Sequence, residues 1–109
     1  MVSFEPAPGE KVVLDEDCAE DKLRSGVLVL TDRRLVFQKT QGRMATLSKK
    51  EGDVVLDIPL NKISAVKAEG FLVKKVVVVS GDQTYKFGVY SNGKWERQIK
   101  QLLNKGGAS

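Results

Sequence analysis

Apolar residues recur along most of this chain in short runs, each about the length of a β-strand. The runs are rich in valine, isoleucine and leucine, residues that pack well on a half-buried sheet. In one run Tyr85, Phe87 and Val89 alternate with Thr84 and Lys86, which is the period of a strand with one buried face. The pattern predicts about seven strands, within residues 10–15, 26–30, 35–38, 54–58, 61–70 and 73–90, the last range holding two.

Two connections between these runs have the composition of tight turns. "TDRR", residues 31–34, separates two apolar runs, and Asp32 tolerates turn conformations by bonding to its own backbone. "SGDQ" carries a Gly-Asp pair, which is typical of a two-residue hairpin turn. Acid–base or anion chemistry by Asp32 with Arg33 or Arg34 is the alternative for "TDRR", but a hairpin turn with exposed charges explains it more simply.

The period changes at the carboxy-terminal end. Large apolar residues fall there at i, i+4, i+7 and i+8, which forms one stripe along a helix: Trp95, Ile99, Leu102 and Leu103. Ser91 or Asn92 can cap the start, and Gly106 lies where the chain is expected to leave the helix. We therefore predict a helix at about 92–105 that buries this stripe against the open end of the strands.

These elements define a single domain that is mainly β with one carboxy-terminal α-helix. About seven antiparallel strands are expected to curl into a partly open barrel or sandwich. Residues 1–9, which carry two prolines and no periodicity, are predicted to be a flexible leader, and residues 106–109 a disordered tail. Residues 16–25 are interpreted as an acidic connection and residues 39–53 as a long polar loop.

The net charge of +4 is unevenly distributed. Residues 1–32 carry eight acidic and three basic side chains, a net charge of −5, whereas the other 77 residues carry six and fifteen, a net charge of +9. Such a dipolar surface orients a molecule against an anionic partner. The alternative is a solvated surface on which the uneven charge has no role.

The composition argues against an enzyme. The chain has no histidine, the commonest general base and metal ligand. Its one cysteine, Cys18, lies among acidic residues that disfavour a thiolate. Those acids lack the spacing of a calcium loop. We therefore predict no catalytic residue, no metal site and no cofactor.

The same features suggest a compartment. Cys18 has no second cysteine for an internal disulfide, which favours a reducing compartment and a cytoplasmic protein. The amino terminus lacks the basic start and apolar core of a secretory signal. The longest apolar runs are also too short to span a membrane.

Several stretches together resemble the pattern of GRAM and bacterial PH-like domains: "GVLVLTDRRLVF", then "IPLNKISAVKAEG", then "KVVVVSGDQTYKFGVYSNGKWERQIKQLL". The resemblance covers roughly Lys11 to Lys105. It implies a split barrel of two packed antiparallel sheets plugged by the carboxy-terminal helix. It implies no enzyme, since PH-like folds commonly bind phosphoinositides, peptides or partner proteins.

Two basic groups are the candidate ligand-binding residues. Four lie in or beside the long loop: Lys39, Arg43, Lys49 and Lys50. In the second group Lys74 and Lys75 follow Phe71, a candidate aromatic for insertion into lipid or docking into a partner. The alternatives are a solvated loop and a Phe71 that folds back into the core. The resemblance places the phosphoinositide signature between the first two strands, where this chain is acidic, which argues against specific inositol-phosphate recognition.

Two functions follow from this. The first is weak peripheral binding of anionic membrane lipid through the basic loop, with Lys74 and Lys75 assisting. The second is a protein–protein or self-assembly module, which binds an acidic partner peptide through an edge strand or the groove beside the carboxy-terminal helix. Nucleic acid is not expected, because the basic residues do not interleave with aromatic ones. The sequence leaves self-association into a homo-oligomer open.

Overall fold

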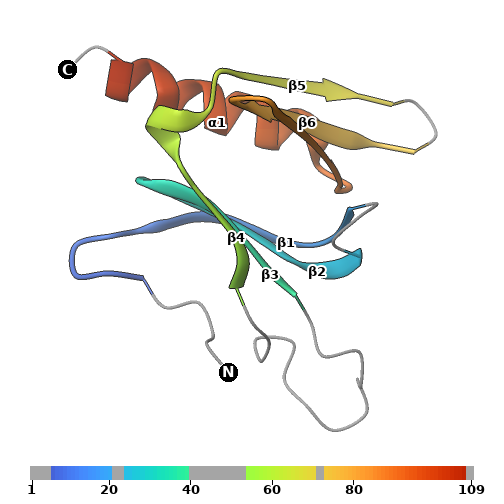
Figure 1. Cartoon of the computed structure of the whole chain (residues 1–109), viewed down its shortest axis with the longest axis horizontal. Helices are drawn as coiled ribbons and strands as arrows, with labels where there is room; N and C mark the ends of the chain where they lie inside the picture. The colour runs from blue at the N-terminus through green and yellow to red at the C-terminus, as the bar shows by residue number, and fades with distance from the viewer. Residues whose placement is uncertain (1–5, 21–23, 40–53, 71–72, 108–109) are drawn as a thin grey trace, which may run out of the picture.

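A computed structural model describes residues 6–20, 24–39, 54–70 and 73–107 of the chain (Figure 1). Its elements confirm the predicted fold class, because seven antiparallel strands precede one carboxy-terminal helix. They are β1 (Val12–Glu20), β2 (Arg24–Thr31), β3 (Arg34–Lys39), β4 (Val54–Pro59), the 3₁₀ turn η1 (Leu60–Lys62), β5 (Ala65–Glu69), β6 (Lys75–Ser80), β7 (Gln83–Gly88) and α1 (Asn92–Gly107).

The strands form one sheet in the order β4-β3-β2-β1-β7-β6-β5, which bends into two layers (Figure 1). The bend lies between β1 and β7, which pair only at Ala19 with Gly88 and at Glu20 with Phe87. All other neighbouring strands pair over at least five positions. The layers β4-β3-β2-β1 and β7-β6-β5 therefore face each other as the walls of a partly open barrel.

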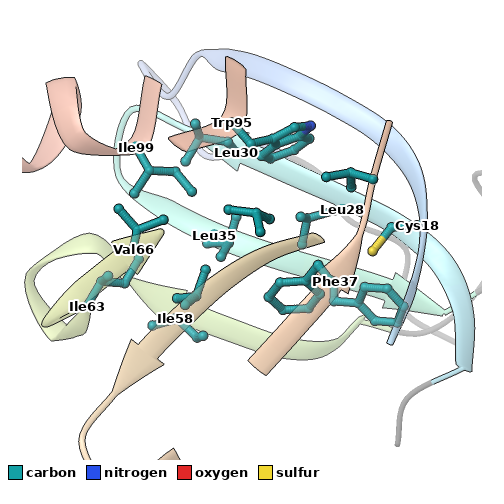
Figure 2. Packing of buried hydrophobic residues seen from close by; sticks show 14 of the residues in the cluster. Cys18, Leu28, Leu30, Leu35, Phe37, Ile58, Ile63, Val66, Trp95 and Ile99 are labelled. Carbon is teal, nitrogen blue, oxygen red and sulfur yellow. The ribbon is translucent and has the colours of Figure 1, made fainter. Parts of the chain in front are cut away.

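The core lies between these layers and is closed by α1 (Figure 2). Trp95 and Ile99 are 1% and 0% exposed, and Leu102 and Leu103 are half-buried against the same cluster. The predicted stripe is therefore confirmed as the buried face of the helix. Burial of each large apolar side chain contributes roughly 1.5–3 kcal/mol, so this stripe anchors α1 firmly to the barrel.

The two tight turns are also confirmed, with one difference. In the β2–β3 turn the hydroxyl of Thr31, rather than Asp32, accepts hydrogen bonds from the backbone N–H groups of Arg33 and Arg34, both at 3.0 Å. Asp32 instead bonds the backbone of Lys11 at the start of β1. Gly81 forms the β6–β7 turn with Asp82, and its φ of 60° suits glycine.

Three predicted boundaries were wrong. Residues 16–20 are not a connection, because β1 continues to Glu20, and β2 begins at Arg24. The strand expected over 61–70 begins only at Ala65, since η1 first turns the chain after β4. The helix continues through Gly106 to Gly107, two residues beyond the predicted end.

The inward positions of β1 explain the first of these errors. Along this strand Glu16, Cys18 and Glu20 are buried or half-buried, whereas Asp15 and Asp17 are exposed. The alternation is therefore that of a strand with one buried face, but two of its inward side chains are acidic. A search for alternating apolar residues does not detect such a strand.

Candidate functional site

The structure places only part of the two predicted basic groups. Arg43, Lys49, Lys50 and Phe71 lie outside the described residues. Lys39 is exposed at the end of β3, Lys74 is exposed just before β6, and Lys75 is half-buried at the first position of β6.

The sheet does not bring Lys39 and Lys75 into one cluster. Lys39 pairs with Gly26 of β2, whereas Lys75 pairs with Gly88 of β7. Their strands are four steps apart in the sheet order, which is about 19 Å along the sheet at about 4.8 Å a step. Lys39 and Lys75 therefore belong to different layers of the bent sheet.

A residue that the sequence did not single out lies beside the second group. The N–H of Val89 donates to the Lys74 carbonyl at 3.3 Å, and this pairing extends the β6–β7 ladder by one position. Val73 precedes Lys74 and Tyr90 follows Val89, so these two residues flank the bonded pair. These two have the most exposed large apolar side chains of the described residues, at 66% and 86%. We call Val73, Lys74, Lys75 and Tyr90 the Tyr90 corner.

The β5–β6 connection reaches the corner through a glycine-dependent bend. Gly70 follows β5 directly and has a φ of 99°, in the region that L side chains rarely adopt. A Cβ atom there would overlap the Val73 carbonyl. Glycine is therefore required for the chain to present Val73 at this position.

The start of α1 holds both ends of this connection. The Asn92 side chain donates to the carbonyl of Glu69 at 3.0 Å and to that of Lys75 at 3.3 Å. Its Oδ1 atom accepts from the N–H of Gly93 at 2.9 Å, one of the free N–H groups in the first turn of the helix. One side chain thus ties β5, β6 and α1 together beside the corner.

Strand β1 fixes the other side of the corner through Glu16. Its carboxylate accepts the backbone N–H of Tyr90 at 2.6 Å and the indole N–H of Trp95 at 2.9 Å. The backbone of Tyr90 is therefore held while its side chain remains in solvent. Binding of a partner therefore has to order the Tyr90 side chain but not its backbone.

The exposed charge at the corner is positive. Lys74 is exposed, Lys75 is half-buried, and Lys94 is exposed in the first turn of α1. Two acidic residues contact this region, Glu16 through the N–H of Tyr90 and Glu69 through its pairing with Lys75, so the three lysines outnumber them. An exposed aromatic beside lysines is therefore presented to an anionic surface or partner.

The charges of "TDRR" have a structural role. All of them were predicted to be exposed, but Arg34 is not. Arg34 is half-buried and forms ion pairs with Glu10 at 2.8 Å and with Asp57 at 2.7 Å. Glu10 is buried and also accepts the Thr31 hydroxyl at 2.6 Å. These hydrogen bonds, led by that of Arg34, lower the pKa of Glu10 to about 2. The network joins the residues before β1 to β3 and β4.

Cys18 does not have the environment of a nucleophile. Burial, followed by the nearby charges of Glu16 and Glu20, raises the pKa of its thiol to about 12. This confirms the expectation that its surroundings disfavour a thiolate. Within the described ranges, His, Cys, Asp and Glu form no group of three or more that could hold a metal ion.

Tyr90 was missed because no local pattern distinguishes it. It follows the alternating strand residues and precedes the helix cap, so it reads as part of a connection. The available signal was the alternation of side chains along a strand. Phe87 and Val89 point inward, so Tyr90, the next residue, is expected to point outward. Its exposure also depends on the distant Glu16, which a single sequence does not reveal.

The overall fold has a counterpart among solved structures. One described as "Vps36 N-terminal PH domain" matches with a TM-score of 0.69 over 96% of this chain and 87% of that chain, at 15% sequence identity. At this identity the likeness shows the fold alone, and the fold is PH-like. No family model matches the sequence. No curated protein matches it at a significant level. The finer resemblance to GRAM domains stays a prediction.

Proposed function

We propose that this PH-like domain is a non-catalytic interaction module that binds the anionic surface of phospholipid membranes weakly, through the Tyr90 corner. The observation that carries the proposal is the exposure of Val73 and Tyr90, the residues that flank the bonded pair of Lys74 and Val89, together with Lys74 and Lys75. Tyrosine favours the membrane–water interface because its ring is apolar and its hydroxyl remains hydrated. No helix in the described part of the chain is long and apolar enough to span a bilayer.

The expected affinity is low and sensitive to salt. A lysine close to an anionic leaflet contributes about 1 kcal/mol, so Lys74 and Lys75 together supply about 2 kcal/mol. Partial burial of the Tyr90 ring and of Val73 adds an apolar contribution of similar order. Lys39, Arg43, Lys49 and Lys50 are predicted to add further attraction from the separate loop. Binding of this kind places the protein at the cytoplasmic face of a membrane reversibly.

Partner binding by strand addition, the second function suggested by the sequence, has less support. At the β4 edge the ladder is interrupted by a bulge at Val55, and the strand ends at Pro59. Bulges and prolines protect an edge from pairing with another strand. At the β5 edge the N–H of Ala68 donates to the carboxylate of Glu96 on α1. Helix α1 therefore occupies part of that edge.

The proposal is tested by co-sedimentation with vesicles of phosphatidylcholine alone and with added phosphatidylserine, at low and physiological salt. The native protein is expected to bind only the anionic vesicles, and less at higher salt. Tyr90→Ala should reduce binding at both salt concentrations, because it removes an apolar contact. The double variant K74E/K75E should abolish it.

A matched control has the same change in net charge at the opposite end of β1. Lys11 and Arg33 are both exposed, and Lys11 lies about 17 Å along β1 from Glu16, the residue that bonds Tyr90, at about 3.3 Å a residue. The double variant K11E/R33E should retain most of the binding. Equal loss in both double variants would mean that only net charge matters. A Tyr90→Ala variant that binds like the native protein would overturn the proposal.

The loop residues are tested separately with K49E/K50E. Loss of binding in this variant alone, with no effect of Tyr90→Ala, would assign the membrane contact to the loop rather than to the corner. Far-UV circular dichroism and thermal unfolding of every variant establish that each one is folded.

A further inference from the structure

The outward side of the β5-β6-β7 layer combines apolar and basic residues in register. In β6 the inward residues Val76 and Val78 are fully buried, whereas Val77 and Val79 point outward and remain partly exposed. Val77 pairs with Lys67 of β5 on one side and with Lys86 of β7 on the other. A lysine therefore flanks the central valine on each neighbouring strand. We call Lys67, Val77, Val79 and Lys86 the outer face.

No described element covers this face. The helix packs on the inward side of the layer, because Trp95 and Ile99 belong to the core cluster with Val66 of β5 (Figure 2). In Figure 1 the layer that contains β5 and β6 lies beside α1, away from β1 to β4. Among the described residues, the cross-strand neighbours of Val77 are thus Lys67 and Lys86, and those of Val79 are Ala65 and Thr84.

The charge of the face is positive. Lys67 is exposed, and the side chain of Lys86 is 49% exposed. Lys75, two residues before Val77 on β6, also points outward and pairs with Glu69 of β5. Glu69 lies 3.5 Å from Lys86, a distance that leaves this ion pair weak and open to exchange.

We propose that the outer face docks an acidic segment of a partner protein that carries apolar residues between its acids. A chain that lies along β6 would place apolar side chains on Val77 and Val79 and carboxylates toward Lys67 and Lys86. The two lysines are two strand steps apart, about 10 Å between Cα atoms, which side chains of one extended segment can span. Opposite charges on the two surfaces would set the orientation of the segment.

Several observations favour a protein segment over a bilayer at this face. Val77 and Val79 are short side chains, set flush with a sheet, and they are partly buried. They offer little that could insert into lipid. The Tyr90 corner differs, because its ring is 86% exposed. The outer face is therefore independent of the membrane contact proposed above.

The test uses two short synthetic peptides: one with aspartates flanking two leucines, and the same peptide with asparagine in place of each aspartate. Titrations of the ¹⁵N-labelled protein are followed by NMR, and the acidic peptide is expected to shift amides of β5, β6 and β7. The variant K67E/K86E should lower the affinity at least tenfold. Val77→Thr, which keeps the shape but adds a hydroxyl, should lower it several-fold. Tyr90→Ala should leave it unchanged.

The variant K11E/R33E is the matched control and should bind the acidic peptide within twofold of the native protein. The proposal is overturned if K11E/R33E weakens binding as much as K67E/K86E, or if the asparagine peptide binds equally well. It is also overturned if the shifted amides lie outside β5, β6 and β7. Shifts at the outer face by phosphatidylserine vesicles, abolished in K67E/K86E, would assign the face to lipid instead. The neutral variant K67Q/K86Q repeats the test if charge reversal disturbs folding.

Discussion

The indole N–H of Trp95 donates to the carboxylate of Glu16 at 2.9 Å, across 79 residues of sequence. The same carboxylate accepts the backbone N–H of Tyr90 at 2.6 Å. One acidic side chain of β1 therefore satisfies the polar atom of Trp95, the largest fully buried side chain of α1. It also fixes the position of the exposed aromatic residue that precedes the helix.

Removal of the Glu16 side chain should destabilise the domain more than removal of the Asp15 side chain. In Glu16→Ala both N–H groups lose their acceptor, and unfolding free energy should fall by about 2–3 kcal/mol. In Glu16→Gln one acceptor oxygen remains, so the loss should be about half as large. Urea unfolding followed by fluorescence of the single tryptophan measures both. Asp15→Ala, on the exposed side of β1, is the control and should change stability by less than about 0.5 kcal/mol.

Glu10 should make stability dependent on acid pH. Its pKa is lowered in the folded protein from 4.5 to about 2, so the folded state favours the charged carboxylate. The stabilisation is therefore fully present above about pH 4.5 and is lost as the pH falls towards about 2. Its size should be on the order of 3 kcal/mol.

Urea unfolding at a series of pH values checks this effect against Glu10→Gln. The difference in unfolding free energy between the native protein and this variant should shrink as the pH falls from about 4.5 towards about 2. A difference that stays constant over this range would show that Arg34 does not hold the carboxylate in its charged form.

Two glycines should respond to alanine in opposite directions. A Cβ atom on Gly26 would lie 2.5 Å from the Gln38 carbonyl oxygen and 2.6 Å from the Phe37 ring, so Gly26→Ala should cost about 2 kcal/mol or more. A Cβ atom on Gly93 meets only the end of the Arg97 side chain at 3.7 Å. Because alanine favours a helix, Gly93→Ala should gain about 0.5–1 kcal/mol. Thermal unfolding of both variants tests the contrast.

Cys18 should be unreactive while the protein is folded. Burial and two carboxylates raise the pKa of its thiol to about 12, so the thiolate is scarce at neutral pH. Alkylation by iodoacetamide at pH 7.5, followed by mass spectrometry, should be slow in buffer and fast in concentrated urea. Equal rates in the two solvents would contradict the buried position of this thiol.

The fold could be predicted from sequence where burial leaves a local pattern. Trp95 and Ile99 fall on one helical face, and the β2–β3 hairpin is enclosed by apolar runs, so both were found. Strand β1 was misjudged because two of its inward residues are Glu16 and Glu20. The partners that make Glu16 tolerable there, Tyr90 and Trp95, come from the other end of the chain.

The candidate site was only partly predictable for a similar reason. Lys74 and Lys75 were recognised as a basic pair from their own composition. Their neighbour Tyr90 could not be placed beside them, because that placement depends on the β6–β7 register and on the bond from Glu16. The exposure of a residue in a short connection is set by long-range contacts rather than by its sequence neighbours.

The junction of β1 with β7, only two residue pairs long, has a consequence for how the chain is made. Its partners are separated by nearly the whole domain, and the core that the four-stranded layer encloses is closed by Trp95 and Ile99 of α1. On the ribosome, β1 to β4 emerge first with their apolar inner face uncovered. That face stays open until α1 has been synthesised, so folding of this domain waits for its last helix.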